Sequence, residues 1–347
     1  MTNLLEKLLS ERDYLMADGA IGTNLFAMGL ETGDAPELWN TEKPENVRAL
    51  HDSFVGAGAD ILVTNTFGAN RYRLMLHDAQ NRAHELNYEG VRIARDAADA
   101  AGRPVVVAAS MGPTGEIFEP VGTVSISDGE AAFAEQAKAQ AEAGADVHWI
   151  ETISGREELT AAIRGASVTG LPVVSTMTFD TVGHTMMGLS PEDAVALKND
   201  LSDELISIGR TGVLAFGANC GVGPGTLIDS VLGISRGGTA DQVIVAKGNC
   251  GIPAYQEGAI VYSGTPEIMA DYARLARDAG ARIIGGCCGT TAVHVKAMVE
   301  ALRHYESKGT PSKEAIESAL GPIDAKPDLP EGSDPHGGRE GRRRRRV

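Results

Sequence analysis

Two adjacent cysteines near the end of the chain are the residues best suited to chemistry. Cys287 and Cys288 follow a short apolar run and two glycines, and they precede Gly-Thr-Thr at 289–291. Neighbouring cysteines do not form an ordinary disulfide without strain, because the bridge needs separated Cβ positions. Thiolates are preferred ligands of zinc, which binds three or four of them in a tetrahedron. The pair therefore predicts part of a metal site.

The other two cysteines each follow a short apolar run. Cys220 follows residues 213–219 and Cys250 follows residues 243–249. If these runs are strands, all four cysteines lie at the carboxyl ends of strands, which is the face where barrel active sites form. A single buried cysteine usually behaves as a small apolar residue. Four at one rim favour a shared site.

Ligation by cysteine alone restricts the chemistry of such a site. Three cysteine ligands leave one position of a tetrahedral zinc open, which is typical of a catalytic centre. A substrate thiol entering that position loses its proton. Because the thiolates already supply negative charge, the bound sulfur stays nucleophilic, whereas neutral histidine ligands favour activation of water or a carbonyl. The pattern therefore predicts alkylation of sulfur.

The elements that would position these residues repeat along the chain. A short apolar segment followed by a helical pattern occurs eight times, and such segments are typical of strands covered on both faces. The predicted strands are residues 14–17, 61–65, 105–110, 147–150, 173–178, 213–218, 243–246 and 282–285. Helical patterns include residues 44–57, 82–100, 129–143, 191–208 and 266–279. Eight units predict an α/β protein with a (β/α)₈ TIM-barrel fold.

The domain organisation follows from where this repeat stops. We expect one barrel domain over residues 1–306, beginning with a short amphipathic helix rather than a signal peptide. An open dinucleotide-binding sheet is disfavoured, because no G-x-G-x-x-G follows the first strand. Residues 307–347 are rich in proline and glycine and end in a run of arginines. We expect a disordered, solvated tail there, with docking on an acidic partner or RNA as the alternative.

Composition narrows the partners and the compartment. The formal net charge is −16, which makes nucleic acid an unlikely main partner. No apolar run approaches the roughly 18 residues of a membrane span. Four cysteines, two of them adjacent, do not suggest a disulfide framework. We therefore expect a cytoplasmic protein with no membrane association.

Several motifs resemble one known family. They are Asp-Gly-Ala-Ile-Gly-Thr at 18–23, Thr-Asn-Thr-Phe at 64–67, Gly-Pro at 112–113, Glu-Thr at 151–152, Gly-Ala-Asn-Cys at 217–220, Lys-Gly-Asn-Cys-Gly at 247–251 and Gly-Cys-Cys-Gly-Thr-Thr at 286–291. Over about residues 10–305 the chain resembles the homocysteine S-methyltransferases. That family includes betaine, S-methylmethionine and cobalamin-dependent enzymes. The resemblance implies a zinc barrel that forms methionine.

The resemblance also implies which cysteines bind zinc. The ligands would be Cys220, Cys287 and Cys288, and the zinc-bound thiolate of homocysteine would attack a methyl donor. Cys250 departs from the family pattern, which usually has a small residue there. We expect Cys250 to be a spectator, with a transient fourth ligand in the empty enzyme as the alternative.

Three further residues are implied to hold the amino-acid end of homocysteine. They are Asp18, Gly19 and Glu151. The chemistry agrees, because a glutamate carboxylate can pair with an ammonium group and backbone N–H groups near Gly19 can bind a carboxylate. The alternative role for Asp18 and Glu151 is to cap the ends of their strands.

The motifs leave the methyl donor open. Trp39 resembles the cage tryptophan of the betaine enzymes, where aromatic rings hold a quaternary ammonium. Gly68 and Thr152 stand where the cage tyrosines would be. The run 68–73 is more similar to the methionine-synthase branch, in which a methylated corrinoid on a partner protein would dock over the open rim. S-methylmethionine is the third candidate donor.

Two alternative functions, from other classes of protein, remain open. One is a phosphate-binding barrel that holds a phosphate at residues 286–291, where barrels often do so. The other is a non-catalytic zinc-binding or thiol-binding module. The first leaves the placement of the cysteines unexplained and predicts no zinc, and the second predicts no methionine formation.

Overall fold

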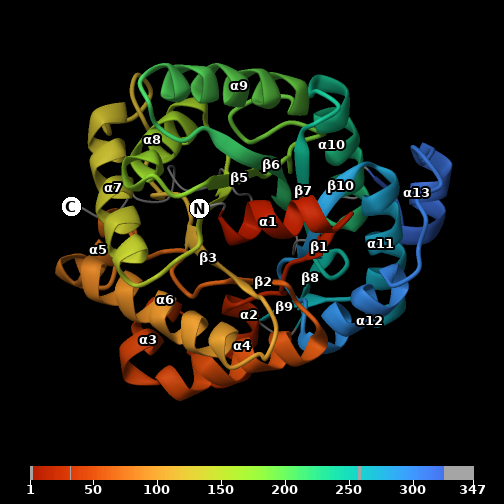
Figure 1. Cartoon of the computed structure of the whole chain (residues 1–347), viewed down its shortest axis with the longest axis horizontal. Helices are drawn as coiled ribbons and strands as arrows, with labels where there is room; N and C mark the ends of the chain where they lie inside the picture. Colours follow the sequence, from red (N-terminus) through yellow and green to blue (C-terminus); the bar gives the residue numbers. More distant parts are fainter. Residues whose placement is uncertain (1–2, 32, 257–258, 324–347) are drawn as a thin grey trace, which may run out of the picture.

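The core of the molecule is a closed barrel of parallel strands (Figure 1). The computed structural model describes residues 3–31, 33–256 and 259–323. Its main sheet has eight strands in the order β1-β10-β7-β6-β5-β4-β3-β2. A bridge between Ala17 and Ile61 joins the first strand to the second and closes the sheet on itself. The predicted TIM-barrel fold is confirmed.

Each barrel strand falls on a predicted segment, with ends that differ by at most three residues. The strands are β1 (Leu15–Met16), β2 (Ile61–Val63), β3 (Val106–Met111), β4 (Val147–Ile153), β5 (Val173–Met177), β6 (Val213–Cys220), β7 (Val243–Gly248) and β10 (Ala281–Gly286). Nearly all of their residues are buried, because helices cover the outside of the sheet and side chains fill the inside.

The helices form a ring around this sheet (Figure 1). The long ones are α4 (Pro44–Ala57), α6 (Ala83–Asp99), α7 (Ile126–Glu142), α8 (Arg156–Ala166), α9 (Pro191–Ser207), α10 (Pro224–Gly237), α11 (Pro266–Asp278) and α12 (Ala292–Leu302). Some of their starts carry capping side chains. Ser190 and Thr265 each accept a hydrogen bond from a backbone N–H of the first helical turn, which satisfies one of its free donors.

Shorter helices lie in the connections. They are α2 (Gly22–Ala27), η1 (Pro36–Leu38), α3 (Trp39–Glu42), α5 (Arg71–Met75), η2 (Gln80–Arg82) and η3 (Ser167–Thr169). The first three belong to the long connection after β1. None of the helices in the described residues is both long and apolar enough to cross a bilayer.

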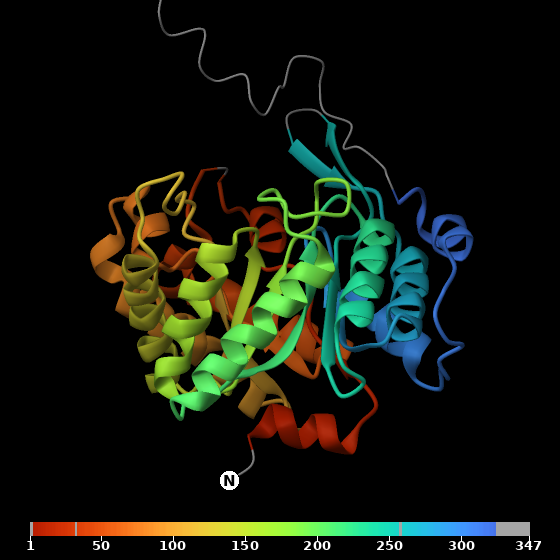
Figure 2. The ribbon, with the colours of Figure 1, turned by 90° about the horizontal axis from the view of Figure 1, so that it is seen from above.

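The amino-terminal end of the barrel is covered by α1 (Leu4–Glu11), which lies on the side opposite the rim (Figure 2). Leu5, Leu8 and Leu9 are buried in the cluster of side chains that fills the inside of the barrel. Asn3 caps the helix, and Glu6 completes the capping box. The predicted amphipathic helix is confirmed.

A two-stranded hairpin stands over the opposite end, beyond the carboxyl ends of the strands (Figure 2). Its strands are β8 (Pro253–Gln256) and β9 (Ala259–Tyr262), which pair antiparallel between β7 and α11. This hairpin was not expected, because its two strands are shorter than the segments that alternate clearly in sequence. It places Tyr262 beside the end of β10.

The folded part continues past the boundary expected at residue 306. Helix α13 (Lys313–Leu320) lies against α10 and α11. Ile316 and Leu320, one turn apart, are its buried residues, and the Thr226 hydroxyl donates a hydrogen bond to the carbonyl of Ile323. Part of the stretch 307–347 therefore packs on the barrel. The rest of the expected tail, residues 324–347 with the arginine run, lies outside the described residues.

Candidate functional site

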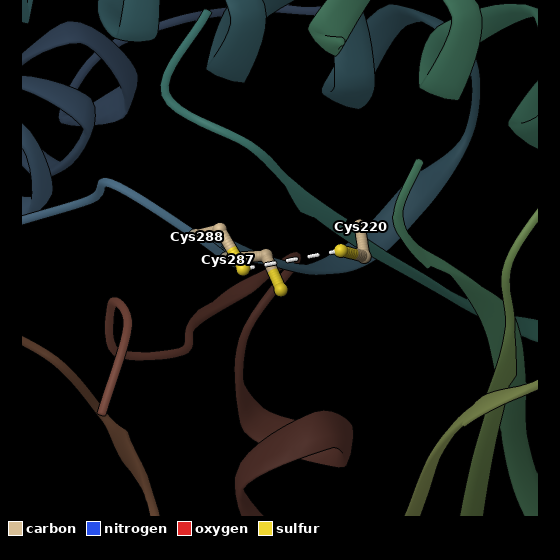
Figure 3. Close-up of side chains that lie close together, drawn as sticks. All are labelled: Cys220, Cys287 and Cys288. Atoms are coloured by element: carbon tan, nitrogen blue, oxygen red, sulfur yellow. Dashed lines mark hydrogen bonds between the residues drawn. The ribbon is translucent and has the colours of Figure 1, made fainter. Parts of the chain in front are cut away.

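The structure brings three of the four cysteines together. Cys220 ends β6, and Cys287 and Cys288 follow β10. Both strands flank β7, where Gly248 pairs with Cys220 on one side and with Gly286 on the other. The three sulfur atoms lie within 4.8 Å of one another, and those of Cys220 and Cys288 are 3.9 Å apart (Figure 3). Two strand ends with one strand between them therefore build a three-thiol cluster.

The end of β6 is held by a buried amide. The Asn219 Oδ1 atom accepts hydrogen bonds from the Thr152 N–H at 2.9 Å and from the Thr176 hydroxyl at 2.6 Å. Its Nδ2 atom lies 3.8 Å from the Cys287 sulfur. The next residue, Cys220, has a φ of 63°. A non-glycine residue in this region is strained, and such strain is typical of functional sites.

The cluster fits a zinc ion in both chemistry and spacing. In a tetrahedron with Zn–S bonds of about 2.3 Å, the sulfur atoms are about 3.8 Å apart, close to the 3.9 Å between Cys220 and Cys288. The hydrogen bonds that the Cys220 thiol donates to the neighbouring sulfur atoms, together with burial, raise its pKa. A bound cation reverses this effect because it stabilises the thiolates. Within the described part of the chain, this is the only such group of metal-binding side chains.

Cys250 lies outside the cluster. Its side chain is buried in the hydrophobic core, and its thiol donates a hydrogen bond to the Gly264 carbonyl at 3.3 Å. Burial raises the pKa of this thiol to about 11. This placement agrees with the expected spectator role.

A cavity of about 490 Å³ opens beside the cysteines at the carboxyl end of the barrel. It extends from the ends of β6 and β10 to the connections after β1 and β2. Among the residues that line it are Gly19, Glu37, Arg73, His77, Glu151, Cys220, Lys247 and Cys288. Barrel active sites form at this end.

Gly19 is placed where a larger residue would not fit. A Cβ atom there would lie 2.6 Å from the Thr290 carbonyl oxygen and 2.8 Å from the Phe54 ring. The next N–H, of Ala20, donates to the same Thr290 carbonyl at 3.0 Å. The segment after β1 is therefore held against the segment after β10, and its backbone lines the cavity beside the cysteines.

Glu151 places a carboxyl group in the cavity wall. Its Oε1 atom accepts a hydrogen bond from the Ser110 hydroxyl at 2.5 Å. Burial raises the pKa of Glu151 to about 7, although the positive charge of Lys247 acts in the opposite direction. This carboxylate can pair with an ammonium group of a bound amino acid.

Asp18 lies behind the cavity wall, hydrogen-bonded to two residues that line the cavity. Its carboxylate accepts hydrogen bonds from the Lys247 ammonium at 2.8 Å and from the Val63 N–H at 2.8 Å. Asp18 is not among the residues that line the described cavity, whereas Lys247 is. Lys247 was not predicted as a site residue. The signal was a lysine directly after the apolar run 243–246, where a buried strand position needs a partner for its charge.

The connection after β1 reaches the cavity through a different residue from the one predicted. Trp39 is buried in the core, with the Lys43 ammonium 4.4 Å from the centre of its ring. It is not among the residues that line the described cavity, but Glu37 is. Glu37 was not predicted, because a single acid in a polar loop gives no sign that it is buried.

Comparisons with known proteins show which family the chain belongs to. A model of the family described as homocysteine S-methyltransferase matches residues 15–302. Methionine synthase from Mycobacterium tuberculosis is 29% identical over 321 residues, covering 88% of this chain and 26% of that protein. The methionine synthase of Mycobacterium leprae is 27% identical over 329 residues, covering 90% and 26%. The chain thus spans about a quarter of the length of these relatives.

Solved structures show the same similarity. The homocysteine methyltransferase MmuM from Escherichia coli, in its metallated form, is 26% identical with a TM-score of 0.69, and the match covers 85% of this chain and 99% of that one. Its oxidized form, also 26% identical, has a TM-score of 0.70 and covers 86% and 99%. Because the family model spans almost the whole barrel, the chain belongs to the homocysteine S-methyltransferase family.

Proposed function

We propose that this protein methylates homocysteine to form methionine, with a zinc ion held by Cys220, Cys287 and Cys288. The observation that carries the proposal is the cluster of three sulfur atoms, within 4.8 Å of one another, at the edge of a cavity. When bound, zinc supplies positive charge that stabilises the thiolate form of a substrate thiol. The sulfur then attacks a methyl carbon of the donor.

The cavity wall supplies charges for the amino-acid end of homocysteine. Glu151 pairs with the ammonium group, and the backbone near Gly19 faces the carboxylate. Lys247 adds a positive charge on the same side, and Asp18 fixes the position of that charge through their ion pair. Asp18 is therefore a positioning residue in this proposal. Holding both ends of the amino acid aligns the sulfur with the donor and lowers the entropic part of the barrier.

The phosphate-binding alternative is disfavoured by the backbone after β10. The N–H groups that a phosphate would need already have partners. The Gly289 N–H donates to the Thr23 hydroxyl at 3.2 Å, the Thr290 N–H to the Cys287 carbonyl at 3.0 Å, and the Thr291 N–H to the His294 ring at 3.1 Å. We therefore do not assign this segment to phosphate.

We propose two sources for the methyl group, both of which are indicated by the sequence motifs. One is betaine, and the other is methylcobalamin on a separate corrinoid protein, since the chain matches about a quarter of the methionine synthases. S-methylmethionine is the alternative small donor. A site built on free thiols favours a reducing compartment such as the cytoplasm.

The direct experiment uses the purified full chain. Its zinc content is measured, and methionine formation from homocysteine is followed with betaine, S-methylmethionine and methylcobalamin in parallel. We expect zinc in equimolar amount and methionine with one of the donors. Stoichiometric zinc with no methionine from any donor would support the non-catalytic module instead.

A further inference from the structure

Glu37 is a buried acid in the cavity wall for which the sequence predicts no role. It lies in η1, on the connection after β1, and is 4% exposed. Its Oε1 atom accepts a hydrogen bond from the Gly68 N–H at 2.5 Å. A carboxylate kept out of water is costly unless it has a partner. The backbone N–H groups of Gly68 and of Glu37 itself compensate only in part for burial, so this side chain needs a further reason to be there.

The space that Glu37 occupies exists because residue 68 is a glycine. A Cβ atom at Gly68 would lie 2.9 Å from Glu37 Oε1, 3.3 Å from its Cδ and 3.4 Å from its Oε2. Position 68 is also where the motifs of the betaine enzymes would place a cage tyrosine. The carboxylate of Glu37 thus fills the region into which a side chain at position 68 would extend.

Positive charge lies close to this carboxylate. Arg73 and His77 line the same cavity, and the charges of both favour the ionised form of Glu37, although burial raises its pKa. Among the ion pairs of the described residues, none involves Arg73. The guanidinium lies against the connection after β3, where a Cβ atom at Gly115 would be 3.3 Å from its Nη1. The cavity wall therefore contains a carboxylate and, near it, a guanidinium that has no ion-pair partner among the described residues.

We propose that Glu37 and Arg73 select the methyl donor, and that the donor is a small zwitterion with a methylated onium group and a carboxylate. The onium group lies against Glu37 and the carboxylate against Arg73. An ion pair with Glu37 then replaces the aromatic cage that would hold a quaternary ammonium. This inference rests on the proposed function, and it favours a free small molecule over a corrinoid protein as the donor.

The chemistry predicts how Glu37 affects the kinetics. A bond forms between the homocysteine sulfur and the methyl carbon, and the bond from that carbon to the onium atom breaks. The bonding electrons stay with the onium atom, so the donor loses its positive charge and leaves as a neutral amine or thioether. Glu37 therefore attracts the donor more strongly than the transition state or the product. An interaction of this kind lowers KM for the donor without raising kcat.

The test compares Glu37→Gln with a matched variant, Glu31→Gln. Both remove one negative charge from the same connection, but Glu31 is exposed and does not line the cavity. With betaine or S-methylmethionine, we expect Glu37→Gln to raise the donor KM by about tenfold or more, with kcat unchanged or higher. The KM for homocysteine and the zinc content should stay at wild-type values. Glu31→Gln should match the wild type in all of these.

Two inhibitors separate a charge effect from a change of shape. The compound 3,3-dimethylbutanoate has the shape of betaine with carbon in place of nitrogen, and tetramethylammonium has the positive charge without the carboxylate. Wild-type protein should bind tetramethylammonium more tightly than Glu37→Gln does, and both should bind dimethylbutanoate about equally. Arg73→Gln should weaken dimethylbutanoate and leave tetramethylammonium unaffected.

The outcomes distinguish this inference from the function on which it rests. The donor assignment is wrong if methionine forms with methylcobalamin alone. It is also wrong if Glu37→Gln leaves the donor KM and the tetramethylammonium affinity unchanged. In both cases the proposed function, methylation of homocysteine, is still supported. If no donor yields methionine, the proposed function itself is wrong. A loss of homocysteine affinity equal to the loss of donor affinity would show a general structural defect and would also overturn the inference.

Discussion

Asp18 and Lys247 form an ion pair of 2.8 Å inside the barrel, with side chains that are 0% and 3% exposed. Asp18 follows β1 and Lys247 lies on β7, so the pair spans β10, which lies between those strands and leads into Cys287 and Cys288. Burial raises the pKa of Asp18, whereas the positive charge of Lys247 lowers it. The pair therefore contributes to the stability of the barrel and also fixes the position of Lys247 in the cavity wall.

Replacing Lys247 with methionine should destabilise the protein strongly. The change leaves Asp18 as a buried charge without its partner, which typically costs about 3–5 kcal/mol. Urea unfolding followed by circular dichroism measures this loss. The double variant Asp18→Asn with Lys247→Met removes both charges and should recover part of it. A single variant within about 1 kcal/mol of the wild type would show that the pair contributes little.

Each cysteine of the cluster should be needed for zinc. Alanine at 220, 287 or 288 leaves two sulfur ligands, so we expect Cys220→Ala, Cys287→Ala and Cys288→Ala to lose zinc and activity together. Metal analysis after dialysis and a methionine assay measure the two properties. Cys250→Ala is the matched control, because it also removes one thiol and lies outside the cluster. Zinc loss in this control would make Cys250 a ligand.

The placement of the cysteines shows what the sequence can predict here. Cys220, Cys287 and Cys288 each follow an apolar run, and the carboxyl ends of parallel strands meet at one rim. Strand periodicity and the cysteine positions therefore predict the barrel and a shared cysteine site at one rim. They do not exclude Cys250, which also follows an apolar run, and the choice of the three ligands came from the family resemblance. The order of β10, β7 and β6, with one strand between the two that carry the ligands, follows from the same regular winding.

Other parts of the site depend on contacts that no local pattern reveals. Glu37 reaches the cavity because Gly68, 31 residues away, leaves room for it. Trp39, two residues further, packs into the core instead. Glu37 lies in a short 3₁₀ helix that ends just before Trp39. Tertiary packing sets the direction of this helix and therefore decides which of the two side chains reaches the cavity. Helix α13 was missed for a similar reason, since only two of its side chains are buried.

Glu151→Gln should weaken homocysteine binding without loss of zinc. Glutamine keeps an oxygen that can accept the Ser110 hydrogen bond, but it removes the charge that pairs with the substrate ammonium. A charged hydrogen bond contributes about 1.5–3 kcal/mol, so the KM for homocysteine should rise roughly 10-fold to 100-fold. Steady-state kinetics at saturating donor measure it. An unchanged KM would place the ammonium elsewhere in the cavity.

His51 should make the protein less stable in mild acid. It is fully buried on α4, and neither ring nitrogen has a hydrogen-bond partner among the described residues. Burial lowers the pKa of His51 to about 4, whereas an unfolded histidine has a pKa of about 6.5. Below that value the unfolded state binds the extra proton and the folded state does not, so stability falls as the pH falls towards 4.

The expected size of this effect is large enough to measure by unfolding at two pH values. Between pH 7 and pH 5, the pKa difference should lower the free energy of unfolding by about 2 kcal/mol. His51→Leu should remove that share of the pH dependence, as measured by urea unfolding at both pH values. His304→Leu is the control, since His304 is exposed and should leave the dependence unchanged. His148 is also buried, and burial lowers its pKa to about 3, so some acid sensitivity should persist in His51→Leu. If His51→Leu showed the full wild-type loss between pH 7 and pH 5, protonation of His51 would not be its cause.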